Sequence, residues 1–118
     1  MITVLFSNCH EIRMGSPYQI CSVRLKGGWI PELEERAWQP LHSRSLDGQY
    51  LCLVEWDILE NTPGFRVVLI DEQRKTVETS HRIPGCCEAL TWGDQVIVWK
   101  AFPQSQGVIA VPFDRPTT

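Results

Sequence analysis

The chain has 118 residues, of which 43% are hydrophobic and 21% are charged, and its net charge is −3. This length and composition predict a single domain over residues 1–118 and exclude a wholly disordered chain. The basic residues are dispersed, so no nucleic-acid partner is expected. No apolar run reaches the roughly 18 residues of a membrane span, so no membrane partner is expected either.

A cytoplasmic location is predicted because the first residues lack the charged segment that opens a signal peptide. The five cysteines are an odd number and are then expected to be reduced thiols. Cys9, Cys21 and Cys52 are predicted to fill core or near-core positions, because free cysteine behaves as a small hydrophobic residue.

The first half of the chain combines two short predicted strands with one ambiguous segment. Residues 2–7 are the first strand, and residues 18–25 are the second because apolar and polar side chains alternate there. Gly27-Gly28 ends the second strand. Residues 31–38 begin with a proline and acidic residues, which favours at most one short helix. The alternative is an irregular crossover that carries two tryptophans onto the core.

The second half is a series of predicted strands separated by turn residues. Residues 50–59 form the clearest strand, with one apolar face and a second face that is apolar at first and then acidic. Residues 65–71 are predicted to be buried on both faces. The remaining strands are expected at residues 75–83, 86–92, 95–102 and 107–113. Pro112 marks the last of them as an edge strand or as ending early, and residues 114–118 are a tail.

An offset of 43 residues relates two of these regions. Leu53-Val54-Glu55-Trp56 aligns with Val96-Ile97-Val98-Trp99, and Gly64-Phe65 aligns with Gly107-Val108. A constant spacing over two strands and their loop is typical of an internal structural repeat.

The run Ser45-Leu46-Asp47-Gly48-Gln49-Tyr50-Leu51 resembles the Ser-Pro-Asp-Gly-Lys/Arg-Tyr-Leu signature of β-propeller repeats, with Leu46 in place of proline. Residues 90–97 resemble a degraded second copy. Over residues 45–114 the resemblance implies two units of a four-stranded antiparallel blade. Residues 50–59, 65–71 and 75–83 would be the second to fourth strands of one unit. Residues 86–92, 95–102 and 107–113 would be the first to third strands of the next.

Two such units cannot close a propeller, which needs about four blades. The predicted fold is therefore an all-β antiparallel meander that closes as a two-sheet sandwich or as a small barrel, including a barrel of the cupin kind. We expect strand 2–7 or 18–25 to pair beside residues 107–113 and so to cover an open sheet edge.

The histidines are the first candidates for chemistry, but no metal-ligand spacing is present. His10 and His42 are predicted at the surface, and His81 is predicted to be partly buried and hydrogen-bonded. The adjacent pair Cys86-Cys87 lacks the spacing of redox and zinc sites. One of its thiols is expected in the core and the other in a turn or edge. No cofactor and no metal are predicted.

Carboxylates give no catalytic pattern either. Glu55 and Asp57 share one face of a strand, about 7 Å apart from the two-residue rise, and could do acid–base work or hold a cation. The favoured interpretation is a solvated strand end. Asp71 and Asp114 are equivalent in the repeat and are predicted to cap turns.

The five tryptophans suggest contacts instead. Trp56 and Trp99 are repeat equivalents and predict a shared packing role. Trp29 follows a glycine pair and Trp92 precedes a tight turn, so each could anchor a protein partner or offer a stacking face to a small ligand. Together with His81, these two are the candidate contact residues.

The sequence therefore favours a small cytoplasmic binding or assembly protein without catalytic activity, which associates with itself or with another protein. The alternative is a cupin-like barrel that binds a small molecule. Such a barrel could also be a metal-dependent enzyme. A third interpretation is a subunit that completes a propeller or a sheet in a larger assembly.

Overall fold

The computed structural model describes residues 1–111 and residue 113, and within them it is all-β without a helix. Residues 31–37 are irregular, so the segment predicted as a short helix or a crossover is a crossover. The strands are β1 (Thr3–Glu11), β2 (Gln19–Lys26), β3 (Trp38–Arg44), β4 (Tyr50–Trp56), β5 (Gly64–Asp71), β6 (Thr76–Thr79), β7 (Ile83–Pro84), β8 (Cys86–Trp92), β9 (Val96–Phe102) and β10 (Ser105–Ala110).

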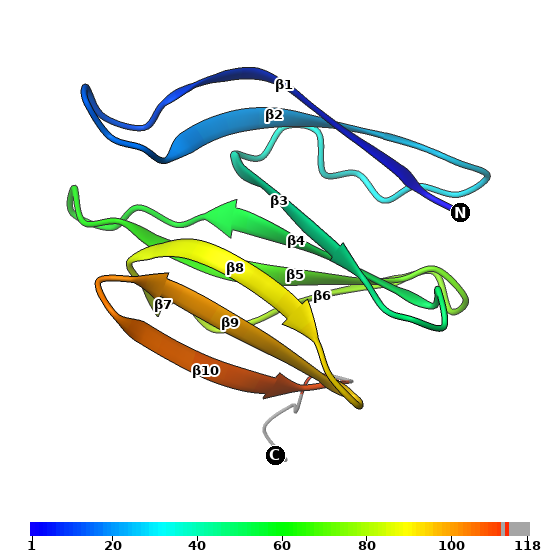
Figure 1. Cartoon of the computed structure of the whole chain (residues 1–118). Helices are drawn as coiled ribbons and strands as arrows, with labels where there is room; N and C mark the ends of the chain where they lie inside the picture. Colours follow the sequence, from blue (N-terminus) through cyan, green and yellow to red (C-terminus); the bar gives the residue numbers. More distant parts are fainter. Residues whose placement is uncertain (112, 114–118) are drawn as a thin grey trace.

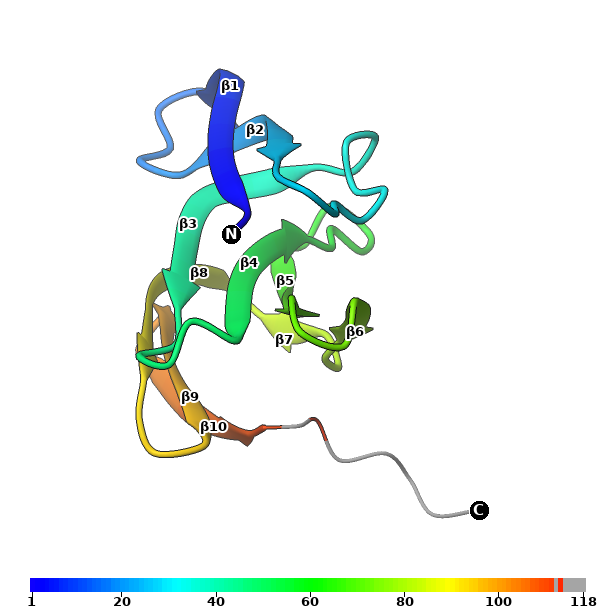
Figure 2. The same cartoon turned by 90° about the vertical axis from the view of Figure 1, so that its right-hand side faces the viewer.

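The strands form two antiparallel sheets. The larger sheet has the order β1-β2-β3-β4-β5-β6, with β7 pairing to β5, and the smaller sheet has the order β10-β9-β8. Strands β1 and β2 lie on one side of β4 and β5, and β8–β10 lie on the other (Figures 1 and 2). The predicted meander is confirmed, and it closes as two packed sheets.

Strand β3 is the element that the sequence did not predict, because Pro40 lies inside it. Proline cannot donate to a strand ladder and is tolerated at bulges and edges. The pairing of β3 with β4 shifts register between Gln39 and His42, so Pro40 lies at this irregularity. The strand predicted at 75–83 is also interrupted: β6 ends at Thr79, and β7 begins at Ile83.

The prediction that strand 2–7 or 18–25 pairs beside residues 107–113 is wrong. β1 and β2 form a hairpin. β2 then pairs antiparallel with β3, and this pairing is between Cys21 and Trp38. The indole of Trp56 also donates a hydrogen bond to the Gln19 carbonyl at 2.9 Å, which fastens β2 to β4. Among the described residues, β10 pairs only with β9. Pro112 and the tail at 114–118 lie outside the described residues.

The central strands β4 and β5 are buried on both faces, as residues 65–71 were predicted to be. One face contributes Leu51, Leu53, Val68 and Ile70 to a core shared with β2 and with Trp38. The other face contributes Cys52, Val54, Phe65, Val67 and Leu69 to a second core, shared with β8 and β9. Alternation of side chains along a strand thus supplies two cores from one pair of strands.

One buried polar side chain joins the two sheets. The Gln39 amide donates to the Cys87 carbonyl at 2.9 Å, and the Cys87 N–H donates to the Gln39 side-chain oxygen at 2.9 Å. Gln39 therefore pairs with the backbone of β8 as a neighbouring strand would, and it satisfies two buried groups that water cannot reach.

The turn of the propeller-like signature is closed by its own side chains. Asp47 accepts hydrogen bonds from the Ser45 hydroxyl at 2.7 Å and from the Gln49 N–H at 2.9 Å. The Ser45 hydroxyl in turn accepts the Tyr50 N–H. Gly48 has φ +79°, a conformation that glycine adopts at no steric cost. The hydrogen bonds to Asp47, chiefly that from Ser45, hold its pKa below the ordinary value.

Asp71 caps a turn as predicted, because its carboxylate accepts the N–H groups of Gln73 and Arg74. Its repeat equivalent, Asp114, lies outside the described residues.

The two hairpins related by the 43-residue offset differ in register by one residue. Trp56 pairs with Phe65 in the first, whereas Trp99 pairs with Gly107 in the second. A Cβ atom at Gly107 would lie 2.5 Å from the Trp99 ring, so glycine here makes room for the indole. The internal repeat itself stays a prediction.

Candidate binding site

An open groove of about 730 Å³ lies at one end of the two sheets. It is formed by the β1–β2 loop, the β4–β5 loop, β7, and the turn between β9 and β10, which meet on the left in Figure 1. Proline and aromatic side chains make up about half of its lining: Pro17, Tyr18, Pro63, Pro84, Trp99, Phe102 and Pro103. Phe102 is 56% exposed, which is unusual for so large an apolar side chain.

Hydrogen bonds between the loops hold the groove in shape. The Arg82 guanidinium donates to the carbonyls of Asp57 and Thr62, both at 2.9 Å. Gly85 donates its N–H to the Pro63 carbonyl at 3.0 Å. Gly85 has φ +102°, and a Cβ atom there would lie 2.3 Å from the Phe102 carbonyl oxygen. Position 85 of the groove can therefore be occupied without strain only by glycine.

Two polar groups of the groove, the Tyr18 hydroxyl and the Cys86 thiol, have raised pKa values. Partial burial, followed by the 2.7 Å hydrogen bond to Glu88, raises the pKa of Tyr18 to about 12, so its hydroxyl is protonated at neutral pH. Burial raises the pKa of the Cys86 thiol above its ordinary value, which disfavours the nucleophilic thiolate.

A second open cavity, of about 580 Å³, lies beside the smaller sheet. Most of its lining comes from β6, from the β6–β7 segment, which includes His81, and from β10, which includes Val108. Arg66 on β5 and Trp99 on β9 complete this part of the wall. Trp99 lines both cavities and meets the Phe65 ring edge-on at 5.9 Å between centroids. It therefore packs in the second core and is also partly exposed at the surface.

The three predicted contact residues line no common cavity within residues 1–111 and 113. His81 lines the second cavity. Trp92 stacks on Tyr50 with 5.7 Å between ring centroids, and its indole donates to the Ser43 carbonyl at 3.0 Å. Trp29 packs partly buried against the first core. Much of the surface of both indoles is therefore in contact with the rest of the protein, and the N–H of Trp92 is also hydrogen-bonded.

All three histidines are exposed, which corrects the prediction of partial burial for His81. β6 ends at Thr79, so His81 leaves the strand face that it would have shared with Val77. His10 lies on β1, and His42 lies on β3, with 5.9 Å between its ring centroid and that of Phe6. No group of three metal-ligating side chains occurs within the described part of the chain.

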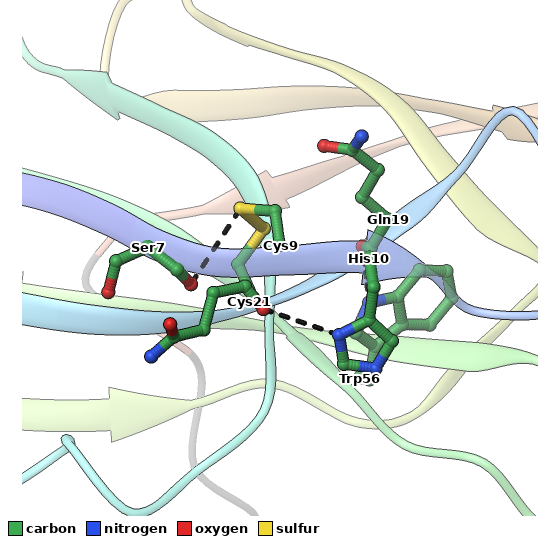
Figure 3. The surroundings of a disulfide bond; sticks show 7 residues. Ser7, Cys9, His10, Gln19, Cys21 and Trp56 are labelled. Atoms are coloured by element: carbon green, nitrogen blue, oxygen red, sulfur yellow. Dashed lines mark hydrogen bonds between the residues drawn. A yellow bond between two sulfur atoms is a disulfide. The ribbon is translucent and has the colours of Figure 1, made fainter.

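The cysteines differ most from their prediction. Cys52 and Cys21 are buried as predicted, whereas Cys9 is exposed. Cys9 and Cys21 form a disulfide, so the expectation that all five cysteines are reduced thiols is wrong for these two (Figure 3). The pairing of β1 with β2 shifts register between Ser7 and His10. Cys9 lies in that irregularity opposite Cys21, with 4.1 Å between their Cα atoms.

The adjacent thiols Cys86 and Cys87 are free and both are buried, and they begin β8, which is an edge strand of the smaller sheet. Strand β8 places Cys87 in the second core and Cys86 beneath the groove loops. Burial raises the pKa of Cys87 to about 12, and it also raises the pKa of Cys52.

Glu55 and Asp57 are not a solvated strand end. The Arg36 guanidinium binds both carboxylate oxygens of Glu55, one of them at 2.7 Å, and these hydrogen bonds hold the pKa of Arg36 above its ordinary value. Arg66 binds Asp57 at 2.6 Å. Both carboxylates have structural roles. Glu55 on β4 binds the crossover segment through Arg36, and Asp57, directly after β4, binds β5 through Arg66.

Sequence reasoning missed the groove residues Arg13, Tyr18 and Phe102. Each lies in a loop or at a strand end close to a proline. The available signal was the presence of proline and aromatic residues in several separate loops. The sequence does not show that these loops lie together, so it could not indicate a groove.

Comparisons with protein-family models, with curated proteins and with solved structures found no match. Across the described residues, no helix is long and apolar enough to cross a membrane.

Proposed function

We propose that this protein is a non-catalytic binding and assembly module that associates with a second copy of itself through the edge of β10. The observation that carries this proposal is an unprotected edge strand. Strand β10 pairs on one side only within the described residues, and its six residues include no charge and no proline.

The other strands at the borders of the sheets are protected in ways that natural proteins commonly use. β1 contains the acidic residue Glu11 and the irregularity between Ser7 and His10. β6 is only four residues long and contains Glu78. β8 is covered where Gln39 binds both backbone groups of Cys87. Only β10, among the described borders, has none of these features.

A second copy is a suitable partner for this strand. Two β10 strands related by a two-fold axis would pair antiparallel and extend the three-stranded sheet into six strands. Because β10 is uncharged, no like charges would face each other in such a pair. Val108 is 61% exposed on β10 and would contribute apolar contact area. His81 and Trp99 line the cavity beside this strand.

A charged residue at the edge tests the proposal. We expect the wild-type chain to be a dimer in size-exclusion chromatography with light scattering. Val108→Lys should raise the dimer dissociation constant at least tenfold, about 1.4 kcal/mol, because it brings two ammonium groups into one interface. Leu46→Lys is the matched control, since Leu46 is fully exposed in a distant turn.

Both variants should keep the wild-type circular-dichroism spectrum and melting temperature, because both side chains are exposed. A wild-type chain that stays monomeric at high micromolar concentration would contradict the proposal. Equal effects of the two lysines would also contradict it, because the interface would then lie elsewhere.

We also propose the cytoplasm as the compartment of this protein. The free thiols Cys52, Cys86 and Cys87 support this, while the Cys9–Cys21 bond is of a kind that cytosolic reductants normally open. Cys21 is buried, so thiols are trapped by acid quenching of intact cells and then alkylated under denaturing conditions; mass spectrometry is expected to find both Cys9 and Cys21 labelled. Protection of this pair in cells, with labelling only after reduction, would place the protein in an oxidising compartment.

A further inference from the structure

We infer that the groove binds a small apolar molecule carrying one anionic group, such as a carboxylate. This goes beyond self-association, because the groove lies at the loop end of the two sheets and the β10 edge lies along the smaller one. The inference rests on the shape and lining of the groove and on the charge at its mouth.

The body of the groove suits an apolar ligand. Its volume of about 730 Å³ falls within the ~300–1,000 Å³ that is typical of small-molecule sites. Proline and aromatic rings lose little conformational freedom when they contact a ligand, since few of their bonds rotate. The Arg82 and Gly85 hydrogen bonds fix the loops before a ligand arrives. A preformed apolar wall reduces the entropy cost of binding.

The described lining of the groove carries one charge, and that charge is positive. Arg13 is the only charged side chain among the described residues that line it. Two acids lie close to the lining without belonging to it: Glu88 accepts the hydroxyl of the lining residue Tyr18, and Glu11 accepts the Gly15 N–H at 2.9 Å. An anionic group on the ligand would therefore meet a cation without a competing carboxylate in the lining.

The Arg13 guanidinium also has N–H groups that are available to donate hydrogen bonds to a ligand. One of its terminal nitrogens donates to the Asn61 carbonyl, and among the described residues Arg13 forms no ion pair. A guanidinium has five N–H donors, and it binds a carboxylate with two parallel hydrogen bonds. The contact with Asn61 positions the guanidinium and leaves most of its donors available.

Two fluorescent probes that differ in charge test this inference on the full chain. 1-Anilinonaphthalene-8-sulfonate is an aromatic anion, and N-phenyl-1-naphthylamine is its neutral counterpart. We expect both to bind the wild-type chain. Arg13→Gln should weaken binding of the anion about tenfold, the effect of losing a charged hydrogen bond, and that of the neutral probe less than twofold. Arg13→Lys should recover most of the anion affinity.

Two further variants locate the site. Phe102→Ala should weaken both probes several-fold, because it removes an apolar wall that carries no charge. Arg74→Gln is the matched charge control, since it removes one cation from a distant turn and should change neither affinity. Circular dichroism and thermal melting of each variant show whether the fold is retained.

The outcomes separate this inference from the proposed self-association. Repeating both titrations in the Val108→Lys variant should give unchanged affinities, because Val108 does not line the groove. Equal weakening of both probes by Arg13→Gln, or no weakening of the anion, would overturn the anionic part of the inference. Failure of both probes to bind the folded chain would overturn it entirely, whatever the oligomeric state.

Discussion

Replacing Gln39 with alanine is expected to lower the free energy of unfolding by about 3–5 kcal/mol, one of the two largest losses predicted for a single substitution here. Gln39 is 2% exposed, and its amide makes two 2.9 Å hydrogen bonds with the backbone of Cys87. Alanine would leave the N–H and C=O of Cys87 buried without partners, and it would open a cavity between the sheets. Urea denaturation followed by tryptophan fluorescence measures the loss.

Gln39→Glu separates the hydrogen bonds from the cavity, because it preserves the side-chain volume. Its ionised carboxylate can accept the Cys87 N–H but cannot donate to the Cys87 carbonyl. In the folded state burial raises the pKa of such a carboxyl, so this variant should gain stability relative to wild type as the pH falls and the group takes up a proton. A loss below about 1 kcal/mol for Gln39→Ala would show that the link between the sheets contributes little.

Trp38→Ala is the second substitution with a large expected effect, again about 3–5 kcal/mol. Trp38 is fully buried in the first core, and its indole donates to the Leu33 carbonyl at 3.1 Å. The Arg36 guanidinium lies over its ring, 5.4 Å from the centroid. The substitution removes this apolar volume and the hydrogen bond that holds the crossover segment.

Two conservative variants make this prediction specific. Trp38→Phe keeps an aromatic ring but loses the donor to Leu33, so a loss of about 1–2 kcal/mol is expected. Trp29→Phe is the control, because Trp29 is only partly buried and should cost less. Equal losses for Trp38→Phe and Trp29→Phe, measured by urea denaturation, would show that Trp38 is not the centre of the first core.

The central strands could be predicted because their signals are local. Apolar side chains recur on both faces of residues 65–71, and a strand with this pattern has to be covered on both sides. The turn at Ser45–Tyr50 is also local, since its side chains bond to backbone groups within five residues of each other. Alternation and turn chemistry therefore predicted β4, β5 and the hairpin ends.

Predictions that depended on distant partners were less successful. Strand β3 was missed because Pro40 looks like a breaker until the irregularity opposite β4 is known. Glu55 and Asp57 looked solvated because their arginine partners come from other segments. The Cys9–Cys21 bond depends on a register shift that composition does not reveal.

By itself, the sequence of this protein determined the all-β class, the position of most strands and the chemistry of its turns. These features depend on side-chain alternation and on hydrogen bonds between near neighbours. Only the tertiary structure decided where β1 and β2 lie in the larger sheet, how β4 and β5 contribute to two cores, and where the groove forms. Those features depend on contacts such as Gln39 with Cys87, 48 residues apart, and Tyr18 with Glu88, 70 residues apart. No short sequence window contains both partners of such a contact.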